Sequence, residues 1–357
     1  LEFRRVLFRS RSALPASFIL RCQQFSKEPF MSKPIVWVVA TGGTIASKFD
    51  AAIGGHVAAA SADELVAAVP ELTDHAEIRA VEHSRINSAG IDTPTVFALR
   101  DRIVKLLADP QVAGAVITHG TATLEETAYM MDLLIDSPKP VVVTGAQRNF
   151  DEKDADGPRN ILFAVMVAAN PASRERGALV AVGGEIHAAR DVYKAHTYRL
   201  NAFSSRDGGK LGEVSHDGVY YFARPDRRMH FNVDHIKQNV HLIVMTQGSN
   251  DLLIRACIAG KADGIIIEGI GGGNMNVPFY DALVDALAAG IPVVIASRHL
   301  GGQPHPSKAY KGSLKSLVDR GAIAGHYMSG VKARILLMIA LAKTKDKKEL
   351  AEIFARA

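Results

Sequence analysis

The chain has 357 residues, of which 48% are hydrophobic, 22% charged and 6% aromatic, and it carries a formal net charge of +5 and two cysteines. This length predicts two domains, and the composition excludes a collagen-like chain, a disulfide scaffold and a mostly disordered protein. Two cysteines cannot build a zinc-ribbon framework and form no secretory pattern, which favours a reducing compartment. No uninterrupted apolar run reaches the roughly 18 residues of a membrane span, so we expect no contact with a membrane.

The positive charge is concentrated in residues 1–30, which hold six basic and two acidic residues, a net charge of +4. The other 327 residues carry 36 basic and 35 acidic side chains, so they offer no basic surface for nucleic acid. Residues 1–30 begin with Leu1 and are rich in arginine, as in an organelle transit peptide or an extension ahead of Met31. We interpret them as a non-native or disordered extension and exclude them from the fold.

From Met31 onward, short apolar runs alternate with segments of helical periodicity. Runs such as residues 35–40 are apolar throughout, as in buried parallel strands. The predicted strands are 35–40, 112–118, 141–144, 179–182 and 185–188. The last two are expected to form one strand that continues past a Gly-Gly bend. The predicted helices are 62–69, 96–108, 124–135 and 161–170. This alternation predicts a sheet covered by helices on both faces.

A second alternation begins after the polar, less periodic residues 197–237. It predicts strands at 240–245, 264–268 and 292–296 and helices at 251–259, 279–289, 332–342 and 347–357. The predicted fold class is therefore α/β: a larger N-terminal α/β domain with a mixed sheet, and a smaller, Rossmann-like parallel C-terminal domain. We expect the first domain to cover residues 31–225, a linker 226–238 and the second domain 239–357.

The first motif that can carry chemistry, ATGGTIAS at residues 40–47, follows the first predicted strand. Ligands of parallel sheets bind beyond the carboxyl ends of the strands. Glycines such as Gly43 let backbone N–H groups approach a substrate, and Thr44 adds a hydroxyl, a combination typical of an oxyanion hole beside a nucleophile. The alternatives are a phosphate-binding loop or a plain turn, although neither the G-x-G-x-x-G order nor the P-loop lysine is present.

The second motif, ITHGTATLEET at residues 117–127, follows another predicted strand. It places Thr121 and Thr123 at a strand-to-helix turn and Glu125 and Glu126 in the first helical turn. Capping threonines and glutamates that complement the helix dipole are the alternative interpretation.

Taken in order, these motifs resemble the bacterial-type L-asparaginase/glutaminase family. The similarity covers residues 34–357 and includes TGGTIA, HGTATLEETA, TGAQR, ADGPRN (155–160), ARDVYK (189–194), GIGGGN (269–274) and KARILLM (332–338). The resemblance implies a threonine nucleophile that hydrolyses the side-chain carboxamide of L-asparagine or a related small amide. It also implies a homotetramer or homodimer. We expect the enzyme to need no cofactor and no metal, and the lack of a secretory signal after Met31 favours the cytoplasm.

The resemblance assigns roles residue by residue. Thr44 matches the nucleophile, and Thr121 and Lys194 match two members of a proton-relay triad. Ser88 matches the serine that binds the substrate's α-carboxylate. We expect backbone N–H groups around Gly43 and Thr121 to hold the oxyanion, and Gly43, Ser88, Ala89, Gly120 and Ala122 to bind the substrate. A lysine held away from water has the shifted pKa that such a relay needs.

Several positions depart from the family pattern around the substrate's α-ammonium group. Ala122 stands where the triad has its aspartate, Ala89 where the family has Gln or Glu, and Gly272 where it has asparagine. Residues 298–305, which the resemblance places at a neighbouring subunit's site, contain no acid, and residues 47–57 contain His56 but no lid tyrosine. Tyr193 and His119 are the candidates for a replacement proton acceptor.

These departures leave alternatives to asparagine hydrolysis. One is an amidase for an amide without a free α-amino group, because a buried ammonium without a partner binds poorly. Another is a catalytically impaired homologue that only binds an amino acid or amide. Nucleotide binding at residues 269–273 has the least support.

Overall fold

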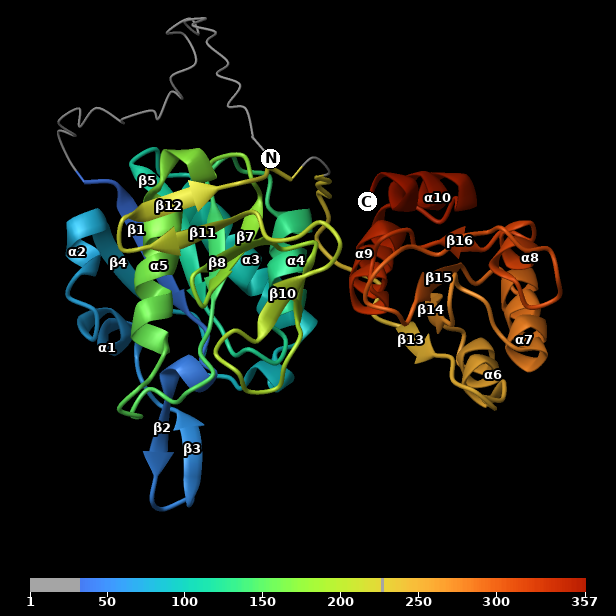
Figure 1. Ribbon diagram of the computed structural model, residues 1–357, viewed down its shortest axis with the longest axis horizontal. Helices are drawn as coiled ribbons and strands as arrows, with labels where there is room; N and C mark the ends of the chain where they lie inside the picture. Colours follow the sequence, from blue (N-terminus) through green and yellow to red (C-terminus); the bar gives the residue numbers. More distant parts are fainter. Residues whose placement is uncertain (1–32, 226–227) are drawn as a thin grey trace, which may run out of the picture. The chain divides into compact units, whose positions relative to one another are not determined.

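An eight-stranded mixed sheet forms the framework of the N-terminal half of the chain (Figure 1). The computed structural model describes residues 33–225 and 228–357, and the predicted extension of residues 1–30 lies outside them. The strands lie in the order β12-β11-β8-β7-β6-β5-β1-β4. Their bounds are β1 Ile35–Ala40, β4 Glu77–Glu82, β5 Val112–Thr118, β6 Val141–Thr144, β7 Ala178–Val182, β8 Glu185–Ala188, β11 Gly212–Ser215 and β12 Gly218–Tyr221. Strands β4, β1, β5, β6 and β7 are parallel and the other three antiparallel, which confirms the predicted mixed sheet.

Helices cover both faces of this sheet, because successive side chains of each strand point to opposite faces. On β1, Val36 and Val38 belong to one core cluster and Ile35 and Val39 to another. The first cluster includes side chains of α1 (Ala62–Ala67), α2 (Leu72–His75) and α5 (Gly157–Ala169). The second includes α3 (Thr93–Leu107) and α4 (Leu124–Leu134).

Strands β7 and β8 form a hairpin, whereas the sequence analysis expected a strand that continues past the two glycines. Gly183 and Gly184 have φ angles of 62° and 82°, and Val182 pairs with Glu185 across them. A two-residue turn with both φ angles positive matches the twist of a hairpin, so the chain reverses here.

Two further pairs of strands lie outside the eight-stranded sheet, and the sequence analysis predicted neither. β2 (Ser47–Asp50) and β3 (Gly55–Ala58) form an antiparallel hairpin that projects from the N-terminal half in Figure 1. β9 (Val192–Lys194) pairs with β10 (Phe203–Ser205), which lies within the segment expected to be irregular.

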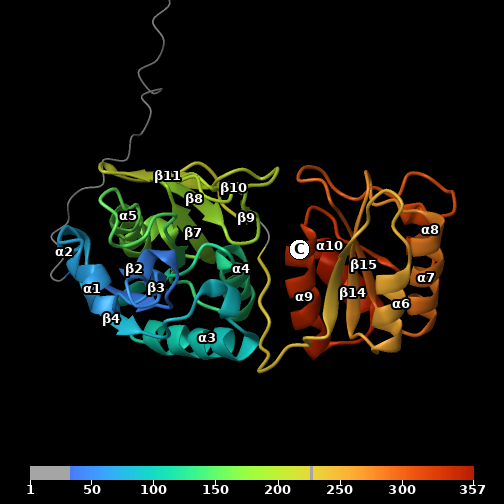
Figure 2. The ribbon, with the colours of Figure 1, turned by 90° about the horizontal axis from the view of Figure 1, so that it is seen from below.

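The C-terminal half contains a four-stranded parallel sheet in the order β13-β14-β15-β16, as predicted for a Rossmann-like unit. Helices α9 and α10 cover one face of it and α6, α7 and α8 the other (Figure 2). The bounds are β13 Val240–Val244, α6 Leu252–Ala259, β14 Gly264–Gly269, α7 Val277–Ala288, β15 Val293–Ser297, α8 Leu314–Val318, β16 Ile323–Ala324, α9 Gly330–Lys343 and α10 Lys347–Arg356. The linker at residues 226–238 stays a prediction. None of the helices in the described ranges has the length and apolarity that crossing a bilayer requires.

Candidate active site

The polar loops of the two motifs meet where the order of the strands reverses. The chain runs from β1 to β4 on one side and later returns to form β5 on the other side of β1. The carboxyl ends of β1 and β5 at such a reversal form the usual ligand crevice of an open α/β sheet. A cavity of about 650 Å³ lies there. Its lining includes these predicted site residues: Gly43, Thr44, Ser88, Gly120, Thr121, Ala122 and Lys194.

The two loops approach each other backbone to backbone, and glycine makes this approach possible. Gly43 has φ 83° and ψ −173°. A Cβ atom at Gly43 would lie 2.3 Å from the Cα atom of Gly120, closer than any real contact. In turn, a Cβ atom at Gly120 would lie 2.6 Å from the Ser88 hydroxyl oxygen. The glycines therefore bring the loops after β1, β4 and β5 together around the cavity.

Thr44 lies in this cavity with its hydroxyl group free. It opens the short 3-10 helix η1 (Thr44–Ala46) directly after the Gly43 turn and is half-buried. Its Oγ1 atom makes no hydrogen bond to any residue in the described parts of the chain, whereas nearby Ser47 donates its hydroxyl to the Gly43 carbonyl at 3.0 Å. An unengaged hydroxyl that lines a cavity is available to a substrate.

Thr121 and Lys194 form a close pair that also lines the cavity. The Lys194 ammonium group donates a hydrogen bond to Thr121 Oγ1 at 2.7 Å. Thr121 is buried, and burial lowers the pKa of Lys194 below the ordinary value for lysine. A lysine with a lowered pKa can exchange a proton with the hydroxyl that it contacts.

Glu125 contacts Lys194 directly, and a second lysine, Lys332, contacts the backbone of Glu125. The Lys194 backbone N–H donates to Glu125 Oε2 at 2.5 Å. The ammonium group of Lys332, on α9, donates to the backbone carbonyls of Glu125 at 2.5 Å and Ala189 at 2.8 Å. Lys332 is buried, and desolvation lowers its pKa to about 8 against the attraction of Glu125. Glu125 thus has a positioning role in addition to the predicted interaction with the helix dipole.

Ser88, which matches the family pattern, and the departing positions Ala89 and Ala122 lie in different surroundings. Ser88 is 2% exposed, and its carbonyl accepts a hydrogen bond from the Thr123 hydroxyl at 2.8 Å. Ala89, next to it, is exposed and is absent from the cavity lining. Ala122 is exposed toward the cavity, where its methyl group offers neither charge nor a hydrogen bond.

Other polar residues line the cavity without having been assigned a role from the sequence. They come from the loops after β4, β6 and β9, and they are Arg85, Asn87, Gln147, Asn149, Thr197 and Tyr198. Gln147 belongs to the TGAQR motif, and its position directly after a predicted strand was the available signal. Tyr198 supplies a tyrosine from outside residues 47–57, and His56 also lines the cavity.

The two candidates for a replacement proton acceptor do not line the cavity. His119 is fully buried, its Nδ1 atom lies 2.8 Å from the Gly120 carbonyl, and burial lowers its pKa to about 4. It is therefore neutral at pH 7 and holds the Gly120 turn. Tyr193 lies on β9 beside Lys194, outside the cavity lining.

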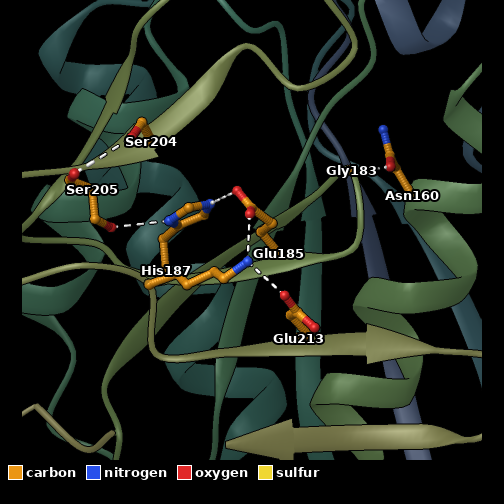
Figure 3. Close-up of polar contacts among 8 residues, drawn as sticks. Asn160, Gly183, Glu185, His187, Ser204, Ser205 and Glu213 are labelled. Carbon is orange, nitrogen blue, oxygen red and sulfur yellow. Dashed lines mark hydrogen bonds and ion pairs between the residues drawn. The ribbon is translucent and has the colours of Figure 1, made fainter. Parts of the chain in front are cut away.

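A separate series of hydroxyl, imidazole and carboxylate groups joins β8, β10 and β11 (Figure 3). Ser205 Oγ lies 2.9 Å from His187 Nδ1, and His187 Nε2 lies 3.6 Å from Glu185 Oε2. Lys210 bridges Glu185 at 2.7 Å and Glu213 at 2.5 Å. His187 is 1% exposed and does not reach the cavity, so this series holds strands together and is not a catalytic triad.

No group of three or more His, Cys, Asp or Glu side chains within residues 33–225 and 228–357 is arranged to hold a metal ion. The lining of the cavity likewise presents hydroxyl, amide and cationic groups, and these are suited to an organic substrate with hydrogen-bond acceptors.

Comparisons with known proteins match both halves of the chain. The family profile described as "Asparaginase, N-terminal" matches residues 35–227, and "Glutaminase/Asparaginase C-terminal domain" matches residues 239–354. L-asparaginase 2 of Escherichia coli strain K12 is 34% identical over 91% of this chain and 93% of its own length. The glutaminase-asparaginase of Pseudomonas fluorescens biotype A is 33% identical over 89% of each chain.

A solved structure agrees with the fold as well. The crystal structure of a probable cytoplasmic L-asparaginase from Campylobacter jejuni superposes with a TM-score of 0.82 at 32% identity, over 91% of this chain and all of that one. Because sequence profiles, relatives and fold agree over both halves, the chain belongs to the L-asparaginase/glutaminase family of amide hydrolases.

Proposed function

We propose that this protein hydrolyses the side-chain carboxamide of L-asparagine or a related small amide to the acid and ammonia, with Thr44 as the nucleophile. The observation that carries the proposal is the free Thr44 hydroxyl in a cavity that is also lined by the Thr121–Lys194 pair, which is joined by a hydrogen bond of 2.7 Å. A nucleophile beside a proton-transferring pair and backbone donors is the arrangement that acyl transfer requires.

In the first step, Thr44 Oγ1 bonds to the carboxamide carbon while its proton passes to the Thr121–Lys194 pair. Backbone N–H groups around Gly43 and Thr121 stabilise the oxyanion. The C–N bond then breaks, the nitrogen takes up the proton, and ammonia leaves an ester on Thr44. Water attacks this ester, releases the acid and returns the proton to Thr44.

The same proposal covers assembly and compartment. The family resemblance favours a homotetramer or homodimer, and the Campylobacter relative is described as cytoplasmic. We propose a cytoplasmic homo-oligomer that acts on a small amide without cofactor.

Ala122 supports a second candidate, a homologue that binds an amide without turning it over. A methyl group at this position cannot assist Lys194 as a carboxylate would. The free Thr44 hydroxyl and the intact Thr121–Lys194 contact favour the enzyme.

The test is ammonia release by the purified full chain from L-asparagine, D-asparagine, L-glutamine and amides without an amino group. We expect release from at least one amide, its loss in Thr44→Ala and partial retention in Thr44→Ser. Thr246→Ala, at an exposed position of the C-terminal half, is the matched control and keeps the activity. Absence of Thr44-dependent ammonia from the whole panel contradicts the proposal and leaves the binding homologue.

A further inference from the structure

The cavity at the candidate active site has an unusual charge balance. Of its lining residues, all of which lie in the described part of the chain, none is Asp or Glu, and three are basic. These are Arg85, Lys194 and His56. A ligand that carries an ammonium group therefore meets basic side chains and no carboxylate among these lining residues.

Four carboxylates contact residues that line the cavity, and each of them already accepts a hydrogen bond. Glu82 accepts from the Arg85 guanidinium, and Glu125 accepts from the backbone N–H of Lys194. Asp151 accepts the Phe49 N–H at 2.7 Å and lies 3.7 Å from the His56 ring.

Glu152 is the fourth of these carboxylates, and it contacts Asn149, which lines the cavity. It accepts both the backbone and the side-chain N–H groups of Asn149, at 2.9 and 2.5 Å. Recruiting any of these four carboxylates to a substrate ammonium would break contacts that they already make.

Donors for a carboxylate are abundant in the loop after β4. Arg85 donates hydrogen bonds from Nε and Nη2 to Glu82, and its Nη1 group makes none to residues 33–225 or 228–357. The Asn87 side-chain oxygen accepts from the Ala89 N–H, and its NH₂ group has no partner in these same ranges. The Ser88 hydroxyl makes no hydrogen bond within the described residues. Three donor groups within four residues suit a planar anion.

We propose that this site selects an anionic amide without an α-ammonium group, that is, the monoamide of a dicarboxylic acid, over L-asparagine. The inference rests on the proposed amidohydrolase function and specifies its substrate class. For succinamate, which is L-asparagine without its α-ammonium group, the reaction consumes one water and yields succinate and ammonium: the amide C–N bond breaks and a C–O bond forms. No oxidant, reductant or further reactant is needed.

The kinetic test compares succinamate with L-asparagine, which differ only in the α-ammonium group. We expect kcat/KM of the full chain to be about 100-fold higher for succinamate, because a desolvated charge without its partner costs several powers of ten in affinity. Ala122→Asp places a carboxylate in the cavity and is expected to reverse this preference. Ala122→Asn, of the same shape without the charge, keeps it. A wild-type enzyme that prefers L-asparagine overturns the inference while upholding the proposed function.

A binding measurement keeps the two proposals separable. Calorimetry on the wild-type chain compares the product succinate with L-aspartate, its α-amino counterpart. Tighter binding of succinate supports the substrate class even where no ammonia is released, in which case only the hydrolytic function fails. Equal or tighter binding of L-aspartate overturns the inference.

Discussion

Replacing Gly43 by alanine tests whether the backbone contact between the loops after β1 and β5 builds the site. The change adds a Cβ atom 2.3 Å from the Gly120 Cα and 2.4 Å from its nitrogen. It also puts a side chain on a backbone with φ 83° and ψ −173°, a region that is nearly exclusive to glycine.

The two effects have separable magnitudes. The backbone conformation costs an alanine about 1–3 kcal/mol. Relieving the overlap requires the two loops to separate, and overpacking of this kind costs about 1–3 kcal/mol more. We therefore expect Gly43→Ala to lose about 2–6 kcal/mol of unfolding free energy. Displacing Thr44 from Thr121 by about 1 Å is expected to lower kcat/KM by about 100-fold.

The matched control is Gly290→Ala. Gly290 has φ 80°, and a Cβ atom there would meet nothing within 4 Å. The control therefore carries a positive φ angle without a steric overlap, and we expect a loss of about 1–2 kcal/mol and full activity. Urea unfolding and ammonia release measure the two quantities. If Gly43→Ala is as stable and as active as Gly290→Ala, the close approach of the loops does not position the nucleophile.

Two further predictions follow from buried basic groups. The pKa of Lys332 is about 8 in the folded chain, below the ordinary 10.5. Between pH 8 and pH 10.5 the folded state therefore binds fewer protons than the unfolded state. The free energy of unfolding rises with pH in this range, by up to about 3 kcal/mol. Urea unfolding of Lys332→Met should lack this rise. The control Lys343→Met, at an exposed position of the same helix, should keep it. The same dependence of unfolding free energy on pH in wild type and both variants would contradict the assignment. The pKa of His187 falls from 6.5 to about 4 on burial, so its contribution is present above pH 6.5 and is lost as the pH falls toward 4, by about 2 kcal/mol between pH 7 and pH 5. Comparing the urea midpoints of wild type and His187→Gln at these two pH values checks this, and an unchanged difference between the proteins would refute it.

The elements that could be predicted from the sequence are those whose own residues form a clear hydrophobic pattern. Residues 35–40 and 112–118 are apolar at nearly every position, and they are β1 and β5 within the sheet. The β2–β3 hairpin escaped prediction because Phe49 and Ile53 are exposed, so no buried face imposes an alternating pattern. The reversal at Gly183 was missed because two glycines permit either a bend or a turn.

Some residues of the candidate site could likewise be predicted from the sequence pattern, and others could not. Gly43, Thr44 and Thr121 follow predicted strands, so their common edge could be inferred from the topology of parallel sheets. Lys194 was identified by family resemblance alone, since 73 residues separate it from the threonine that it contacts. Arg85 and Tyr198 belong to no motif, and only the folded chain brings them to the cavity.

The contact between Lys332 and the N-terminal half has a consequence for how the protein is made. Translation completes residues 44–194 well before α9, and domains usually begin to fold in that order. Until α9 has left the ribosome, the carbonyls of Glu125 and Ala189 lack the ammonium group that joins them. A nascent chain that already contains every proposed catalytic residue therefore still lacks these two hydrogen bonds, and we expect amidase activity only after α9 has been synthesised.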